Sequence, residues 1–234
     1  MNAPLPPRIV WSDPHVVVVD KPSGVPSVPS RTPLDPPAVA AVLAGAWGPL
    51  EAVHRLDRDT SGLLVLARTP AARTALGRAF ESRRVTKRYL AIVVGVPPAD
   101  SGTIHLPLAD DPARPPAKRV DPILGRRATT RWEVLDASQG TGCRGTLVAL
   151  EPITGRSHQL RAHLAWLGCP ILGDPLYGRD AGPQRPALAL HAAAIGFPHP
   201  EDGRVVQLVA PPAGGPWDAF AGAAPGGRDG RRRG

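Results

Sequence analysis

The sequence predicts an α+β protein, with a mixed, largely antiparallel β-sheet flanked by a few helices. Segments with strand character outnumber helical ones along the chain. The two kinds do not alternate regularly, as they would in a doubly wound parallel sheet. With 234 residues, 42% of them hydrophobic, the chain is long enough to bury a sizeable core without disulfides or metals.

Eight segments have the short, apolar and often β-branched character of strands. Residues 16–19 are four valines in a row, which is typical of a strand buried on both faces. Segments 129–135 and 146–151 are expected to pair antiparallel, and the last two segments to close the fold as another pair. In chain order the strands are expected at 8–10, 16–20, 63–67, 88–94, 129–135, 146–151, 187–197 and 205–209.

Three segments have helical character and are expected at 38–46, 70–83 and 157–167. The second begins at Pro70, in the first turn of a helix, where a missing N–H costs little. In the third, Leu160, Leu164 and Leu167 form an apolar stripe and Gly168 is placed to end the helix.

The remaining segments divide the chain into one domain with two flanking pieces. Residues 1–7 are Pro-rich and are expected to be loose, and the folded domain is expected to span 8–211. Residues 212–234 are rich in Gly, Pro and Arg, which predicts a disordered tail. Within the domain, 108–126 is expected to be a long loop because it is Pro-rich, charged and too polar for the core.

Composition excludes several classes of protein. The two cysteines, Cys143 and Cys169, are 26 positions apart, which excludes a disulfide scaffold and a thiolate zinc site and fits a reducing compartment. No apolar run approaches the roughly 18 residues of a membrane span, and the first residues lack the pattern of a secretory signal. We therefore expect a cytoplasmic protein with no membrane association.

The chain is strongly basic, with 28 Lys and Arg against 20 Asp and Glu, a net charge of +8 and a pI near 10.6. A basic body favours a polyanionic partner such as a nucleic acid. The same arginine content would also follow from GC-rich coding, since Ala, Gly and Pro are abundant too. Charge alone leaves both readings open.

Common cofactor and metal motifs are absent from the sequence. There is no GxxxxGK[ST] loop, no GxGxxG after a strand, and Ser61 does not lie in a GxSxG elbow. His158 and His163 are five residues apart, about 140° around a helix, so they do not face one metal. We therefore expect no cofactor and no metal.

Two dense polar segments remain, HRLDRDTSG at 54–62 and TGRSHQLRAH at 154–163. If they meet in space, an aspartate among several arginines would stay ionised and could act as a nucleophile or a base. The alternative is that Asp57 or Asp59 only caps a loop and that the arginines form a solvated face.

These segments resemble the motifs of the RluA family of RNA pseudouridine synthases. The resemblance covers about residues 8 to 211 and is specific because several motifs agree in order and spacing. The motifs are VVDKPSG at 18–24, HRLDRDTSG at 54–62, FESRRVTKRYLAIVVG at 80–95, TGRSHQLRAHLAWLGCPILGDPLYG at 154–178 and LHA at 190–192.

The resemblance implies roles for four residues. It implies that Asp57 is the catalytic aspartate, that Tyr89 packs on the target base, and that Arg161 pairs with the aspartate. It further implies that Arg55 fills the gap left by the flipped base. The implied reaction breaks the N1–C1′ bond of a uridine and forms a C5–C1′ bond, which is redox-neutral and fits the absence of cofactor motifs.

The resemblance is closest to the short branch of the family, since the motifs leave no room for an N-terminal S4 module. It implies a uridine in a hairpin loop of 23S rRNA, in the tRNA anticodon loop, or in both. Lys118 and Arg119 lie in the basic loop 112–127 and are expected to contact RNA phosphates, with a merely solvated loop as the alternative. The enzyme is expected to act as a monomer.

Three other functions stay open at this point. The same reaction could occur at another tRNA site. The scaffold could serve a noncatalytic RNA-binding factor, or a glycosylase that releases free uracil.

Overall fold

The computed structural model describes residues 6–29, 35–137, 145–178 and 186–220. Its elements, in chain order, are β1 (Arg8–Ser12), β2 (Val16–Lys21), α1 (Val39–Trp47), β3 (Glu51–Ala52), β4 (Ser61–Ala67), α2 (Pro70–Glu81), β5 (Thr86–Val93), β6 (Ser101–His105), β7 (Leu108–Asp110), β8 (Lys118–Val120), β9 (Thr129–Asp136), β10 (Thr146–Pro152), α3 (Gln159–Trp166), β11 (Leu190–Pro198), β12 (Val205–Val209) and a 3₁₀ helix (Gly215–Phe220).

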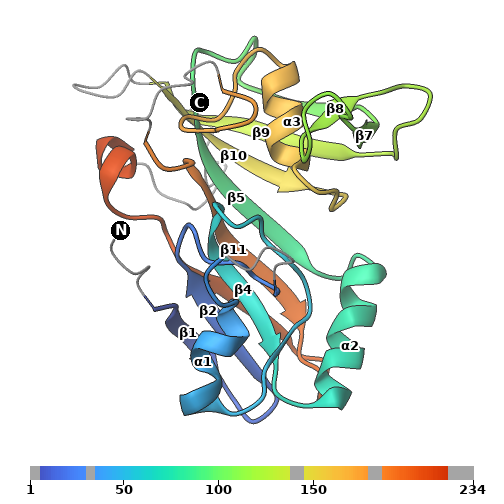
Figure 1. Cartoon of the computed structure of the whole chain (residues 1–234), viewed down its shortest axis with the longest axis vertical. Helices are drawn as coiled ribbons and strands as arrows, with labels where there is room; N and C mark the ends of the chain where they lie inside the picture. The colour runs from blue at the N-terminus through green and yellow to red at the C-terminus, as the bar shows by residue number, and fades with distance from the viewer. Residues whose placement is uncertain (1–5, 30–34, 138–144, 179–185, 221–234) are drawn as a thin grey trace, which may run out of the picture.

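One large sheet organises the molecule. Its main path runs β1-β2-β4-β11-β5-β10-β9-β6, with β12 beside β11 and β3 beside β4. Among the described residues only β4 and β11 pair in parallel. The long strand β5 connects a lower part, which carries α1 and α2, to an upper part, which carries α3 and the β7–β8 hairpin (Figure 1). The mixed, largely antiparallel sheet expected from the sequence is confirmed.

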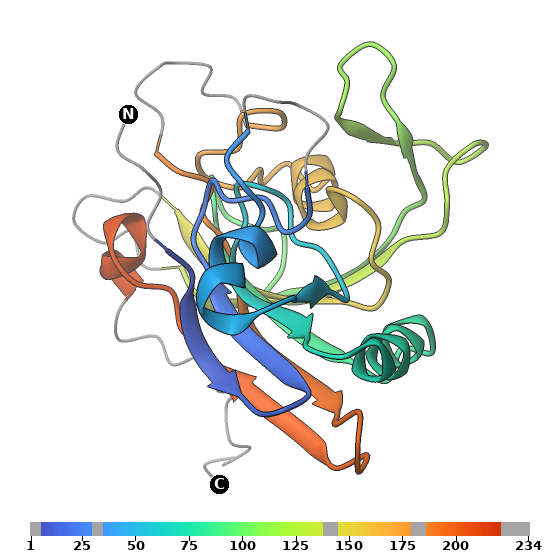
Figure 2. The same cartoon turned by 60° about the horizontal axis from the view of Figure 1, so that its bottom comes forward.

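Both faces of the sheet are buried around β2. Val17 and Val19 belong to one apolar cluster and Val16 and Val18 to another, because successive side chains of a strand point to opposite faces. Helix α1 packs on the first cluster and α2 on the second. Figure 2 shows the two helices apart from one another, with strands of the sheet between them. The run of valines is therefore a fully buried strand, as predicted.

The helices agree with the prediction except at their ends. In α2 the Thr69 side chain accepts a hydrogen bond from Ala72 N at 3.1 Å, and the helix ends at Glu81, two residues before the left-handed Arg83 (φ 58°). Helix α3 begins only at Gln159 because His158 is itself left-handed (φ 53°).

The segment 108–126 differs from the loop that the sequence predicted. It contains the β7–β8 hairpin, and Leu108 is buried with Ala128 and with Ala162 of α3. The prediction was wrong here because two short strands need few apolar side chains when they pack on a helix. The edge strand β6 was also missed, since only its Ile104 is buried.

The C-terminal boundary also differs from the expectation. Residues Gly215–Phe220 form a 3₁₀ helix in which Phe220 is buried, where a tail was expected from residue 212. Trp217 packs against the same core, so two aromatic side chains hold a segment that is otherwise rich in Gly, Ala and Pro. The expectations for residues 1–5, 221–234 and Cys143 lie outside the described residues.

Candidate active site

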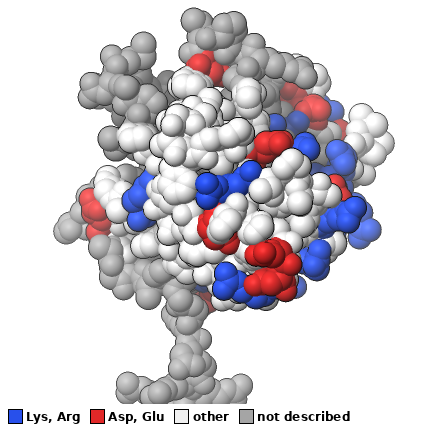
Figure 3. All heavy atoms as spheres, turned by 90° about the horizontal axis from the view of Figure 1, so that it is seen from below, with Lys and Arg blue, Asp and Glu red and all other residues white. Residues whose placement is uncertain are grey.

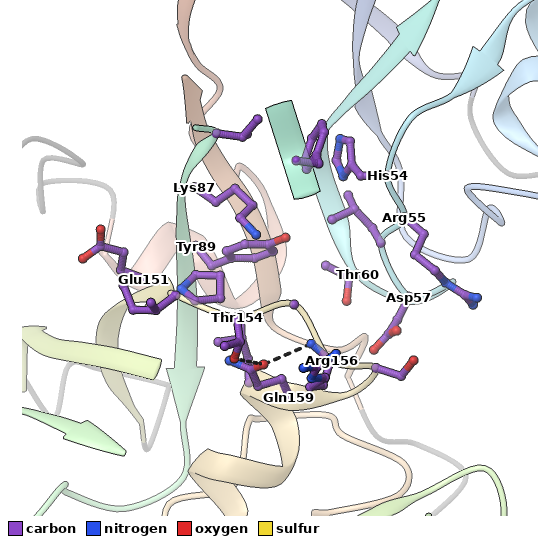
Figure 4. Close-up of a pocket in the computed structure, with 18 of the residues that line it drawn as sticks. His54, Arg55, Asp57, Thr60, Lys87, Tyr89, Glu151, Thr154, Arg156 and Gln159 are labelled. Carbon is purple, nitrogen blue, oxygen red and sulfur yellow. Dashed lines mark hydrogen bonds between the residues drawn. The ribbon is translucent and has the colours of Figure 1, made fainter. Parts of the chain in front are cut away.

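The two polar segments meet at a cavity of about 720 Å³. Its walls come from the loop before β4, the end of α2 with the start of β5, and the 151–161 segment that leads into α3. Figure 4 shows side chains from all three parts pointing into it. Each polar segment therefore contributes to one site.

Hydrogen bonds from the 21–27 segment hold the backbone of the loop that carries Asp57. Ser27 Oγ donates to Leu56 O and accepts from Leu56 N, both at 3.0 Å, while the Leu56 side chain is buried. The Ser23 hydroxyl donates to Asp59 O at 2.8 Å. The backbone on both sides of Asp57 is therefore held in place.

Lys21 completes this support from inside the protein. Its side chain is fully buried, and Nζ donates to the carbonyl oxygens of Pro22, Val25 and Arg58 at 3.0, 2.8 and 2.8 Å. Burial lowers the pKa of Lys21 to about 8, opposed by the nearby carboxylates of Asp59 and Asp57. The ammonium thus connects the 22–25 turn to the loop that carries Asp57 by hydrogen bonds to their carbonyl oxygens.

Arg161 of α3 connects Asp57 to a second aspartate. Its Nε and Nη2 donate to Asp174 at 2.8 Å each, and its Nη1 donates to Asp57 Oδ2 at 3.3 Å. Its side chain is only 4% exposed, so Arg161 does not belong to a solvated face. Asp57 keeps 20% of its side chain exposed, so this carboxylate is open to the cavity.

Tyr177 and His158 surround this ion pair. The Arg161 guanidinium lies 5.3 Å from the centre of the Tyr177 ring, and the Tyr177 hydroxyl accepts from Lys118 N at 2.6 Å. His158 Nδ1 is 3.2 Å from the same hydroxyl, and its Nε2 lies 3.8 Å from Asp57 Oδ2. Burial lowers the pKa of His158, which favours its neutral form.

Tyr89 forms another wall of the cavity. It lies on β5, between its partners Leu150 of β10 and Ala192 of β11, and it is 9% exposed. Burial, and then the charge of Asp57, raises the pKa of its hydroxyl above the ordinary value of 10. The side chain therefore presents an aromatic surface and a protonated hydroxyl at neutral pH.

The three residues expected to bind RNA have different environments. Arg55 is exposed and lines the cavity. Lys118 is ion-paired with Asp110, and Arg119 with Asp121 at 2.9 Å, and neither lines the cavity. The structure thus brings Arg55, Asp57, Tyr89 and Arg161 together, while the charges of Lys118 and Arg119 are already compensated by carboxylates.

Besides Arg55 and Arg161, the basic residues Arg83, Lys87 and Arg156 line the cavity. Arg78, Arg83 and Arg84 are exposed on α2 and the turn after it. Figure 3 shows basic side chains gathered along the side of the molecule where α2 lies, with acidic ones between them.

The described part of the chain offers no group of three or more His, Cys, Asp or Glu that could hold a metal ion. In the same part of the chain, no helix is long and apolar enough to cross a membrane.

Comparison with known proteins decides the family. Residues 15–166 match the model of the RNA pseudouridylate synthase family. The dual-specificity RNA pseudouridine synthase RluA of Haemophilus influenzae is 41% identical over 210 residues, which cover 88% of this chain and 94% of the relative. The RluA protein of Escherichia coli K12 is 40% identical over 213 residues, covering 90% and 96%.

The chain belongs to the RluA family of RNA pseudouridine synthases. Two solved structures agree with this. Human RNA pseudouridylate synthase domain containing 1 matches with a TM-score of 0.75 at 30% identity, covering 88% of this chain and 83% of the other. Human RNA pseudouridylate synthase domain containing 4 matches with a TM-score of 0.69 at 28% identity, covering 87% and 88%.

Sequence reasoning gave no role to two charged residues of this RluA-family site, Asp174 and Lys21. Both lie in quoted motifs, GDPLYG and VVDKPSG. Each is flanked by Gly or Pro and looks like an ordinary turn residue. Their function depends on long-range contacts, Asp174 with Arg161 and Lys21 with the carbonyl of Arg58. The sequence signals of these two residues were therefore limited to the charge of each side chain.

Proposed function

We propose that this RluA-family enzyme isomerises a uridine in a hairpin loop of 23S rRNA, in the tRNA anticodon loop, or in both, with Asp57 as its catalytic residue. The observation that carries the proposal is the position of Asp57. Its carboxylate is open to a cavity that is lined by Tyr89 and Arg55, and it is oriented by Arg161. The dual-specificity names of the bacterial relatives support a choice of more than one RNA.

The geometry suits the steps of the reaction. A uridine that leaves its stack can enter a cavity of about 720 Å³, which is in the usual range for ligand sites, and can stack on the Tyr89 ring. The Asp57 carboxylate is then available as nucleophile or base while the N1–C1′ bond breaks. The base rotates, the C5–C1′ bond forms, and the proton lost from C5 is balanced by one gained at N1.

The proposal extends to the remaining groups around the cavity. The exposed Arg55 is placed to occupy the gap that the flipped base leaves in the RNA. Lys118 and Arg119 would contact phosphates only by exchanging their carboxylate partners for RNA. Because all these side chains come from one chain, the proposed site needs no second copy, and we propose that the enzyme acts as a monomer in the cytoplasm.

The test is to incubate the wild type and Asp57→Asn with tRNA and 23S rRNA that lack the modification, in a buffer with a metal chelator. Pseudouridine is then mapped at nucleotide resolution. We expect product at a defined hairpin uridine with the wild type only. RNA binding without product would favour a noncatalytic RNA-binding factor, and free uracil would indicate a glycosylase. Product with Asp57→Asn would contradict the assignment of Asp57.

A further inference from the structure

All three lysines of this protein are at least partly buried, and they differ in their partners, since Lys118 is paired with Asp110. Lys21 is fully buried and donates to three carbonyl oxygens. Lys87 is half-buried, yet within the described residues its ammonium has no hydrogen bond and no ion pair. Because a partly desolvated charge is stabilised by pairing with an anion, Lys87 is available to an anionic partner from outside the chain.

Lys87 is directed into the cavity beside Tyr89. The two residues are two positions apart on β5, so both side chains lie on the same face of the strand, and both line the cavity. Figure 4 shows them pointing into it together. On the opposite wall, a Cβ added to Gly155 would lie 3.9 Å from Lys87 Nζ. The ammonium thus lies above the 154–157 loop, at the level of the Tyr89 ring.

The carboxylates around the cavity do not compensate this charge. Burial alone lowers the pKa of Lys87, whereas Asp57 also acts on the pKa of Lys21 and Tyr89. Glu151, another lining carboxylate, is paired with Arg131 at 3.3 Å. Lys87 in turn contributes to the lowered pKa of His54. One side of the cavity therefore carries an uncompensated positive charge.

We propose that Lys87 binds a backbone phosphate of the RNA next to the nucleotide whose base stacks on Tyr89. A nucleotide combines a flat neutral base with a phosphate anion, and the cavity offers an aromatic ring and an unpaired cation on the same strand. Because β5 lies in the middle of the sheet between β10 and β11, the backbone positions of Lys87 and Tyr89 are fixed relative to each other. Lys87 thus sets the position of the target nucleotide. This inference rests on the proposed function.

The first test measures RNA affinity as a function of salt. An anticodon stem-loop RNA is titrated in an Asp57→Asn background, in which the proposed turnover is blocked. We expect Lys87→Gln to weaken binding about tenfold and to reduce the slope of log Kd against log salt by about one, and Lys87→Arg to restore both. Arg73→Gln is the matched control, because Arg73 is exposed and paired with Glu51 on the protein surface and its loss changes the net charge equally.

The second test locates the phosphate. Each phosphodiester of the loop is replaced in turn by a neutral methylphosphonate. One replacement should weaken binding to the protein with Lys87 and have no further effect on Lys87→Gln. If every replacement weakens binding equally in both proteins, or if Lys87→Gln changes affinity without changing the salt slope, Lys87 contacts something other than a phosphate and the inference fails.

Two further measurements separate the phosphate contact from effects on folding and from the proposed reaction. Lys87→Gln should melt no lower than its parent, since it removes a charge without a partner. Should it fail to fold, Lys87→Met serves as the second variant for the same titration. If the wild type forms no pseudouridine while these binding results hold, the proposed reaction is wrong and the phosphate contact stands.

Discussion

Arg161 binds Asp174 more closely than it binds Asp57. It donates two hydrogen bonds of 2.8 Å to Asp174 and a single one of 3.3 Å to Asp57. Asp174 Oδ1 also accepts from the backbone N–H groups of Leu176 and Tyr177, so it is held rigidly. A bidentate pair of this kind fixes the guanidinium plane, and the remaining Nη1 is left to orient Asp57.

The first prediction concerns this buried pair. Asp174→Asn should lower the free energy of unfolding by about 3 kcal/mol, because it leaves the Arg161 charge buried without its main counter-charge. It should also lower kcat, since Arg161 loses its orientation toward Asp57. Denaturant unfolding and single-turnover kinetics measure the two effects.

Asp110→Asn is the control for Asp174→Asn. Asp110 is also ion-paired, with Lys118, but its side chain is 85% exposed, so its loss should change stability by less than about 1 kcal/mol. Equal effects of the two substitutions would show that the burial of Asp174 is not what matters.

The sequence was sufficient to predict those elements whose signal lies within a few neighbouring residues. The valines of β2 predict a buried strand because periodicity and β-branching act within a few residues. Pro70 marks the start of α2 for the same reason. The β7–β8 hairpin was missed because its stability depends on contact with α3, which no local pattern records.

The residues of the site show the same difference between what a local motif predicts and what depends on long-range contacts. The resemblance named Asp57, Tyr89, Arg161 and Arg55, and the fold brings all four to one cavity. The importance of Asp174 could not be predicted, because it arises from a contact with Arg161 in another element. Lys118 and Arg119 were chosen for their charge, and a sequence does not reveal that each charge already has a carboxylate partner.

The second prediction concerns the start of β4, directly after the loop that carries Asp57. Gly62 has φ +106°, and a Cβ there would lie 2.4 Å from the Ala192 carbonyl oxygen of β11. Gly62→Ala should therefore destabilise the protein by more than about 2 kcal/mol, since a backbone atom cannot move aside cheaply. Thermal melting measures the loss.

Gly77→Ala is the control for Gly62→Ala. Gly77 lies in α2 with nothing within 4 Å of an added Cβ, so alanine should stabilise the helix by about 0.5–1 kcal/mol. Gly62→Ala melting at or above the wild-type temperature would contradict the close approach of β4 and β11.

The third prediction separates the ring of Tyr89 from its hydroxyl. In the Asp57→Asn background, Tyr89→Phe should bind a hairpin RNA within about twofold of its parent, because the stacking surface is kept. Tyr89→Leu should bind about tenfold more weakly, as expected for the loss of one base–aromatic stack. Fluorescence anisotropy gives the affinities, and circular dichroism checks the fold. Equal affinity of the Phe and Leu variants would exclude stacking on Tyr89.

The last prediction concerns acid stability and depends on His54. Its Nε2 accepts from Val65 N at 3.0 Å, and its ring stacks on Phe80 with centroids 4.7 Å apart. Burial, with a smaller effect of Lys87, lowers the pKa of His54 from 6.5 to about 3. Between these values the unfolded chain binds a proton that the folded chain does not, so stability falls as the pH falls below 6.5.

The His54 contribution should reach about 2 kcal/mol of unfolding free energy between pH 6.5 and pH 5. The Gln side chain of His54→Gln can still accept from Val65 N but does not titrate. Between pH 6.5 and pH 5, the unfolding free energy of this variant should therefore fall by about 2 kcal/mol less than that of the wild type. Urea unfolding at a series of pH values measures the difference. The control is His105→Gln, which removes an exposed imidazole at the end of β6. If His54→Gln and the wild type lose stability in parallel, the buried imidazole is not the group responsible, and the acid sensitivity must come from the carboxylates of the ion pairs instead.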